Sequence, residues 1–215
     1  MHARTARPSP ATSGRLALIA SCAFAAVTSY AQLPPPSVPL LGVGDDRTWI
    51  VVTPLEYRIG DTADKIVVPA GFVTDLASVP SAFWGPPLFL TPAGQYSRAA
   101  IIHDYLYWSQ KCTREQADRL LVIAMKESRV STVDEVTIYE GVHVGGDKAW
   151  SDNARNAIRG LPRILPEAYR QPPDPNMTWA QYAEQLMQAG VKSIEYVDDG
   201  AYCHYGGSMD VPHRP

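Results

Sequence analysis

The sequence predicts an α+β domain in which a small antiparallel β unit is followed by a helical hairpin and further helices. Two observations carry this prediction. Residues 48–75 hold two runs rich in Val, Ile, Thr and aromatic residues, whereas from Ser97 onward the apolar residues recur at helical spacing. The chain has 215 residues and is 46% hydrophobic, which is enough for one ordinary domain with its own core.

Residues 1–31 differ in composition from the rest of the chain. "MHARTARPSPATSGR" holds three Arg and no acid, and the apolar run that follows is too short to span a bilayer well. Small residues at Ser29 and Ala31 are typical of a signal-peptidase site, so we expect a signal peptide that is cut after Ala31. The alternative is a lipoprotein, because "IASC" resembles a lipobox that ends at Cys22.

Cleavage after Ala31 defines the expected mature chain, which would be periplasmic or secreted. Its formal net charge moves from −3 to −6. Because no cluster of Lys and Arg stands out, the sequence gives no support for binding nucleic acid. The two remaining cysteines, Cys112 and Cys203, can form a disulfide in an oxidising compartment, and two unlinked thiols are the alternative.

The β unit is expected after a Pro-rich lead-in at 32–46, which we expect to be extended. Strands are predicted within 48–60 and 64–75, with a turn between them. Pro54 and Pro69 indicate that these strands are short or lie at a sheet edge.

The helical hairpin is expected next. Its first helix covers 97–108 and ends at "SQKC". Thr113 opens the second helix, and Gln116 three residues later completes a capping-box pattern. Apolar residues in "REQADRLLVIAMKES" follow helical spacing, so this helix has one buried face.

Further helices follow the hairpin. A third helix starts near Thr132 and is expected to end at Gly145-Gly146. Residues 161–215 are expected to form a Pro-rich linker, a short helix that begins at Thr178, and an irregular tail.

His103 and Asp104 place a titratable pair inside the apolar run of the first helix. The turn of the hairpin centres near Gln110-Lys111, so Asp118 is the residue that faces His103 across an antiparallel hairpin. A carboxylate beside an imidazole fixes its tautomer and stabilises its protonated form, as a general-base His requires. The spacing therefore predicts a catalytic dyad of His103 and Asp118.

Asp104 is then available for a cation. Calcium prefers carboxylate and backbone carbonyl oxygens. The Gly- and Pro-rich loop "GFVTDLASVPSAFWGPP" can supply carbonyls, and it holds Asp75 as a second carboxylate. We expect calcium as a cofactor at Asp104 and Asp75, where it would polarise an ester carbonyl while the His activates water.

Aromatic residues near these positions are the predicted substrate contacts. Phe83 and Trp84 belong to "AFWGPPLFL", an apolar stretch that can form the rim of a lipid site. Tyr105 and Tyr107 follow the titratable pair on the first helix, and packing in the core or at its rim is the alternative role for them. The predicted partner is a phospholipid or a membrane surface, and the sequence specifies no protein partner.

Three segments resemble a known family. "VPAGFVTDLASVP", "RAAIIHDYLY" and "TREQADRLLVIAM" look like the family known as domain of unknown function 1353 (DUF1353), which turns up often in phage and prophage. The resemblance covers residues 48–150, and we place a DUF1353-like domain at 47–160. It implies little about chemistry.

The helix around His103 also resembles the secretory phospholipases of the A-two class, especially their prokaryotic branch. There a helix that starts Cys-x-x-His-Asp, with a Tyr after it, follows a calcium loop, and a second antiparallel helix carries the Asp of the dyad. The resemblance implies His103 as base, Asp104 as calcium ligand and Asp118 as dyad partner. The sequence departs from that pattern in two respects: Ala100 and Ile101 precede His103 where the Cys is expected, and the glycine pattern of the loop is absent.

These patterns predict an exported hydrolase that acts on an ester, most concretely a glycerophospholipid. One alternative is a non-enzymatic envelope or phage-derived interaction module in which the polar pair is architectural. A second alternative is a cell-wall hydrolase, which the compartment permits but no peptidase motif supports.

Overall fold

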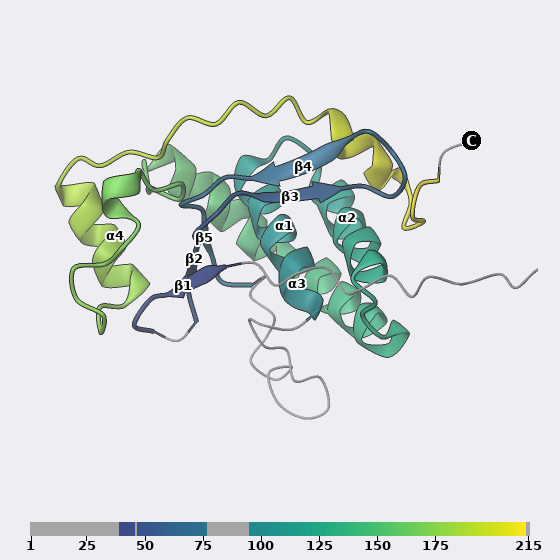
Figure 1. Ribbon diagram of the computed structural model, residues 1–215, viewed down its shortest axis with the longest axis horizontal. Helices are drawn as coiled ribbons and strands as arrows, with labels where there is room; N and C mark the ends of the chain where they lie inside the picture. Colours follow the sequence, from purple (N-terminus) through teal and green to yellow (C-terminus); the bar gives the residue numbers. More distant parts are fainter. Residues whose placement is uncertain (1–38, 46, 77–94, 214–215) are drawn as a thin grey trace, which may run out of the picture. The chain divides into compact units, whose positions relative to one another are not determined.

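The structure is a computed structural model of the 215-residue chain and describes residues 39–45, 47–76 and 95–213. Small antiparallel sheets come first and helices follow, which confirms the predicted α+β class (Figure 1). In the part of the chain so described, no helix has both the length and the apolar character needed to cross a bilayer.

Two small antiparallel sheets make up the β unit. In the first, β2 (Trp49–Val51) pairs on one side with β1 (Leu40–Gly42) and on the other with β5 (Val73–Thr74). In the second, β3 (Leu55–Arg58) pairs with β4 (Lys65–Val68).

Prolines divide each of the two predicted strand regions into a pair of short strands. Pro54 separates β2 from β3, and Pro69 separates β4 from β5, because proline cannot donate a ladder hydrogen bond. The predicted turn lies between β3 and β4, where Gly60 has a φ of 54°. β1 comes from the Pro-rich lead-in, for which the sequence predicted only extended chain.

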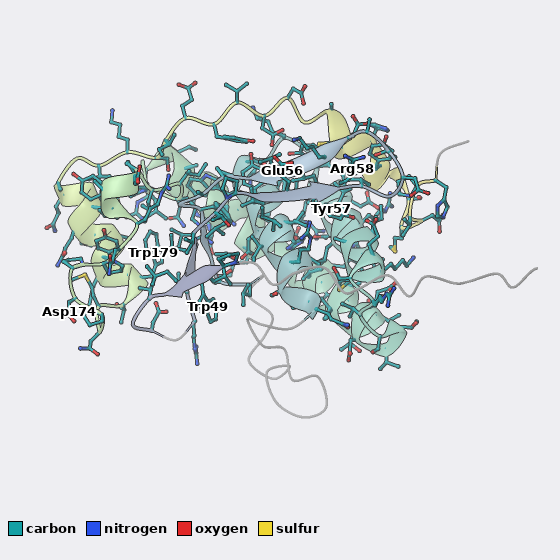
Figure 2. The ribbon with its side chains drawn as sticks, in the orientation of Figure 1. Trp49, Glu56, Tyr57, Arg58, Asp174 and Trp179 are labelled. Carbon is teal, nitrogen blue, oxygen red and sulfur yellow. A yellow bond between two sulfur atoms is a disulfide. The ribbon has the colours of Figure 1, made fainter. Side chains whose placement is uncertain are left out.

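A hydrogen-bond network attaches the second sheet to the helices. In β3 the exposed Glu56 and Arg58 alternate with the buried Tyr57 (Figure 2). The Tyr57 hydroxyl donates to the Glu127 carboxylate, whose other oxygen accepts the Gly60 N–H at 3.0 Å. Because Glu127 ends the second helix, this network fixes the β3–β4 hairpin against it.

The predicted helical hairpin consists of α1 (Gln95–Ser109) and α2 (Arg114–Glu127). The capping box of Thr113 and Gln116 is present at the start of α2, which confirms that prediction. The two helices supply much of the core, and their fully buried residues include Ile101, Ile102, Leu106, Leu120, Leu121 and Ile123.

The third helix, α3 (Thr132–Ile158), is longer than predicted. Its expected end at Gly145-Gly146 is wrong, because the helix continues through both glycines for about three more turns. A glycine inside a helix costs only about 1 kcal/mol relative to alanine, which tertiary packing can offset. Here Gly146 is buried and lies directly against the Tyr107 side chain.

The C-terminal part contains more structure than predicted. The short helix α4 (Trp179–Gln188) follows the N-cap Thr178 as expected. The tail is not wholly irregular, however, because it forms the 3-10 helix η3 (Ala201–Gly207), which lies against α2 (Figure 1). Cys203 in η3 forms the predicted disulfide with Cys112, with Cα atoms 5.2 Å apart, and so ties the tail to the turn of the α1–α2 hairpin.

Candidate functional site

The α1–α2 hairpin brings His103 and Asp118 into contact, as the spacing predicted. His103 Nε2 lies 2.9 Å from Asp118 Oδ1, and the exposed fractions of the two side chains are 3% and 0%. The contact forms because the two positions are mirrored about the turn at Gln110, where the backbone takes a φ of 50°. The predicted pairing is therefore confirmed, and its catalytic role remains a prediction.

Two further side chains hold the Asp118 carboxylate. The Tyr107 hydroxyl donates to Oδ1 at 2.6 Å, and Arg114 Nη1 donates to Oδ2 at 3.0 Å. Arg114 also donates to the carbonyl of His143 at 3.1 Å and pairs with Asp147 at 2.9 Å. A buried carboxylate needs such partners, because breaking a buried ion pair typically costs about 3–5 kcal/mol.

Arg114 supplies a positive charge beside Asp118 that does not come from His103. The guanidinium lies 3.0 Å from Oδ2 and balances the carboxylate charge. A carboxylate oxygen accepts hydrogen bonds, so the contact at Oδ1 selects the His103 tautomer with its N–H on Nε2, which leaves Nδ1 as the acceptor nitrogen of the neutral ring.

Tyr107 completes this arrangement as a donor. Burial, and then its hydrogen bond to Asp118, raise the pKa of Tyr107 above its ordinary value. Its hydroxyl therefore keeps its proton at neutral pH and donates it to Asp118, the carboxylate that also contacts His103. The sequence predicted Tyr107 as a substrate contact, and the structure shows that its hydroxyl contacts Asp118.

The second nitrogen of His103 is left for chemistry. Nδ1 is buried and has no hydrogen-bond partner among the described residues. His103 also lines a cavity of about 370 Å³, which lies in the range of small-molecule sites. An unpartnered basic nitrogen on such a cavity can accept a proton from a bound water.

Small residues of α3 form another part of the cavity wall, namely Gly141, Val142, Gly145, Gly146 and Ala149. A β-carbon added at Gly145 would meet nothing within 4 Å. Gly145 therefore borders open space, whereas Gly146 packs directly against the Tyr107 hydroxyl.

Asp104 lines the same cavity and is bonded to strand β5 and the residue that follows it. Its Oδ2 accepts the Thr74 hydroxyl at 2.5 Å and the Asp75 N–H at 3.1 Å. Asp104 thus contacts the backbone of Asp75, and both residues line the cavity, while their predicted role as cation ligands stays a prediction. A calcium ion at Oδ2 would have to displace the Asp75 N–H, since a donor cannot face a cation.

Among the described residues, no group of three or more His, Cys, Asp or Glu side chains is arranged to hold a metal ion. Calcium binding at Asp104 and Asp75 therefore stays a prediction.

The predicted aromatic contacts have different locations. Tyr107 lines the cavity. Tyr105 lies in the core, 2% exposed, with its ring edge-to-face on Phe72 and its hydroxyl donating to Asp198 at 2.9 Å. Phe83 and Trp84 lie outside the described residues.

Two cationic residues of the site were not predicted. Arg114 stands one helical turn before Asp118, and this i,i+4 spacing was a usable signal for an ion pair. Arg163 lines the cavity from the segment between α3 and α4, and no local pattern links it to His103.

Comparison with known proteins finds a family model that matches the region bearing the site. Residues 49–142 match the model of the family described as protein of unknown function (DUF1353), which confirms the predicted resemblance. The matched region contains His103, Asp104 and Asp118, whereas Arg163 and Cys203 lie beyond it. No curated protein and no solved structure matched the chain.

Proposed function

We propose that this chain, which carries a DUF1353 domain in residues 49–142, is a hydrolase with His103 as general base. One observation carries the proposal: Nε2 of a buried imidazole lies 2.9 Å from a buried carboxylate, while Nδ1 has no partner among the described residues and the ring lines a cavity. A buried nitrogen without a partner is costly, so its retention has a physical explanation if water or substrate completes the bond.

The proposed reaction is hydrolysis of an ester. His103 Nδ1 takes a proton from water as the water oxygen bonds to the ester carbonyl carbon. The imidazolium then returns that proton to the leaving alkoxide as the carbon–oxygen bond breaks, so the products are an acid and an alcohol. Asp118 holds the ring in place and stabilises its transient positive charge. Calcium at Asp104, when bound, would polarise the carbonyl.

A phospholipid is the specific substrate proposed. Its acyl chains would need an apolar surface, and the stretch 82–90 that supplies one in the sequence lies outside the described residues. The described cavity wall has many polar side chains and therefore suits the polar part of such an ester.

Export is also part of the proposal. It is supported by the disulfide between Cys112 and Cys203, because disulfides persist in oxidising compartments. Mass spectrometry of protein from the native host is expected to find Gln32 at the N-terminus. A diacylated Cys22 would contradict this and support the lipoprotein alternative.

The test of the proposed function uses the purified mature chain with a soluble ester and with phospholipid vesicles, each with calcium or with a chelator. His103→Gln keeps an amide donor near the position of Nε2 but removes Nδ1. We expect it to reduce turnover by about 10²–10⁴-fold with little change in melting temperature. The exposed His204→Gln is the matched control.

The interaction module remains a second candidate, favoured by a specific observation. Asp118 and Asp104 both have hydrogen-bond donors from the protein itself, as purely architectural carboxylates do. That interpretation predicts a wild type without activity on either substrate and a His103→Gln variant with a lower melting temperature, because buried groups lose their partners.

A further inference from the structure

Arg163 is one of the charged cavity residues that the proposed reaction does not use. It lines the cavity together with His103. Among the described residues no carboxylate and no hydrogen-bond acceptor contacts its guanidinium, and its Nε is buried without a partner. A buried donor of a charged group without an acceptor is destabilising unless a ligand or water satisfies it.

The fold holds Arg163 in a fixed position. Its carbonyl accepts the Val73 N–H at 2.9 Å, and its own N–H donates to Ser193 Oγ at 2.8 Å. Its guanidinium carbon lies 5.8 Å from the centre of the Phe72 ring. The side chain therefore starts from a backbone anchored on two sides, which lowers the entropy cost of binding a ligand.

Two of the three acids that line the cavity among the described residues have other partners. Asp152 pairs with Lys148 at 2.6 Å and also with Arg155. Asp104 accepts hydrogen bonds from Thr74 and from the Asp75 backbone. Neither of these two carboxylates is an ion-pair partner of Arg163 among the described contacts.

Charge also orients a ligand within the cavity. Asp75 and Asp104 lie next to each other in the cavity wall, because the Asp75 N–H donates to the Asp104 carboxylate. Their negative charges repel an anionic ligand from that part of the wall. On α3, the two cations Lys148 and Arg155 share one carboxylate, Asp152, so this group of three side chains has a net positive charge. An anionic group is thus favoured at Arg163 and disfavoured beside Asp104.

We propose that Arg163 binds an oxyanion of the substrate, a phosphate or a carboxylate, so that the ester cleaved by His103 is an anionic one. The planar guanidinium can donate two parallel hydrogen bonds to either group. The identification of the ligand as substrate rests on the proposed function, whereas binding of the oxyanion does not.

The binding test uses the full mature chain in the His103→Gln background, so that no turnover interferes. Inorganic phosphate and acetate are titrated separately at neutral pH, and the Arg side-chain N–H signals are followed by NMR. Tighter binding of phosphate identifies a phosphate-bearing substrate, and tighter binding of acetate a carboxylate. If neither anion binds, or if either binds equally well without Arg163, the proposal is overturned.

Two variants remove the charge. Arg163→Gln keeps a short polar chain, and Arg163→Met keeps an unbranched apolar chain without the guanidinium that lies over Phe72. Each is expected to weaken anion binding about tenfold or more, because hydrogen bonds to charged groups are the strong ones. The matched control is the exposed Arg159→Gln, which is expected to bind as the parent does. Thermal denaturation shows which variants are folded, and unchanged binding in a folded variant overturns the proposal.

Kinetics separate this inference from the proposed function. With active wild-type His103, Arg163→Gln is expected to raise KM for an anionic ester and to leave KM for a neutral ester unchanged. An equal effect on both esters overturns the inference and leaves the general base intact. If the wild type cleaves no ester but still binds an anion through Arg163, the proposed function fails and the anion site stands.

Discussion

The hydroxyl of Tyr107 occupies the space that a β-carbon on Gly146 would need. From that position it donates to Asp118 at 2.6 Å. The glycine in the middle of α3 therefore determines how closely α1 can approach α3, and through Tyr107 it affects the carboxylate that orients His103.

This relationship predicts opposite effects for two adjacent glycines. Gly146→Ala forces Tyr107 away from Asp118, and we expect it to lower the free energy of unfolding by about 1–3 kcal/mol. At Gly145 an added β-carbon meets nothing within 4 Å, so Gly145→Ala is expected to stabilise the helix by about 0.5–1 kcal/mol. Denaturant unfolding of both variants measures the difference. Equal effects would show that Tyr107 does not depend on Gly146.

The buried carboxylate leads to a second prediction. Asp118→Asn leaves Arg114 without its buried ionic partner, and we expect a loss of about 3–5 kcal/mol in the free energy of unfolding. Asp152→Asn is the matched control, because it removes a more exposed carboxylate that pairs with Lys148, and surface pairs contribute about 0–1 kcal/mol. Chemical denaturation compares them. A loss at Asp118 no larger than at Asp152 contradicts the role of Asp118 as a buried anchor.

The sequence was sufficient to predict contacts between residues that are joined by a short connection, because their spacing along the chain then determines which side chains meet. A tight turn after Ser109 converts the distance along the chain between His103 and Asp118 into a direct pair. The capping boxes at Thr113 and Thr178 are equally local, since donor and acceptor lie three residues apart. Such contacts depend on little outside their own segment.

The sequence was insufficient where distant packing decides. Gly145-Gly146 resembles a helix end, and only the packing of Tyr107 explains why α3 continues. The backbone of Arg163 is held beside the cavity by a hydrogen bond from Val73, a residue far away in the sequence. Such a long-range contact produces no periodic pattern in the sequence. The anion site was therefore not predictable from local patterns.

The disulfide yields a third prediction. Cys112 and Cys203 are 91 residues apart in the chain, and cross-links of long loops typically stabilise a protein by about 2–4 kcal/mol. Replacing both by Ser is expected to lower the free energy of unfolding by that amount and to increase proteolysis near η3. Limited proteolysis with and without a reductant checks this. A tail that is protected equally in both conditions means that its other hydrogen bonds suffice.

Glu127 gives a prediction about pH. Burial raises the pKa of Glu127, although the hydrogen bond from Tyr57 opposes the shift. A raised pKa in the folded state means that the stability from the neutral carboxyl is present below the unfolded-state pKa and is lost as pH rises through the folded-state pKa. Glu127→Gln mimics the neutral form, so its stability relative to wild type is expected to increase as the pH rises above about 4, the ordinary pKa of a Glu side chain.

Thermal unfolding across this pH range measures that trend. Glu115→Gln, on the exposed face of α2, is the matched control for losing a carboxylate from the helix. A constant difference between Glu127→Gln and wild type at every pH would rule out the assigned role of burial.

Asp104 separates architecture from cation binding. Thr74→Val removes the hydroxyl that donates to the buried Asp104 carboxylate, and we expect it to cost about 1–3 kcal/mol of stability with or without calcium. Thr137→Val is the control, because that hydroxyl donates to a carbonyl on the exposed face of α3. If calcium binds at Asp104, excess calcium raises the wild-type melting temperature by mass action, and Asp104→Asn abolishes the rise. A melting temperature that calcium leaves unchanged assigns Asp104 to anchoring the segment that begins at Asp75, because the N–H of that residue is then its permanent donor.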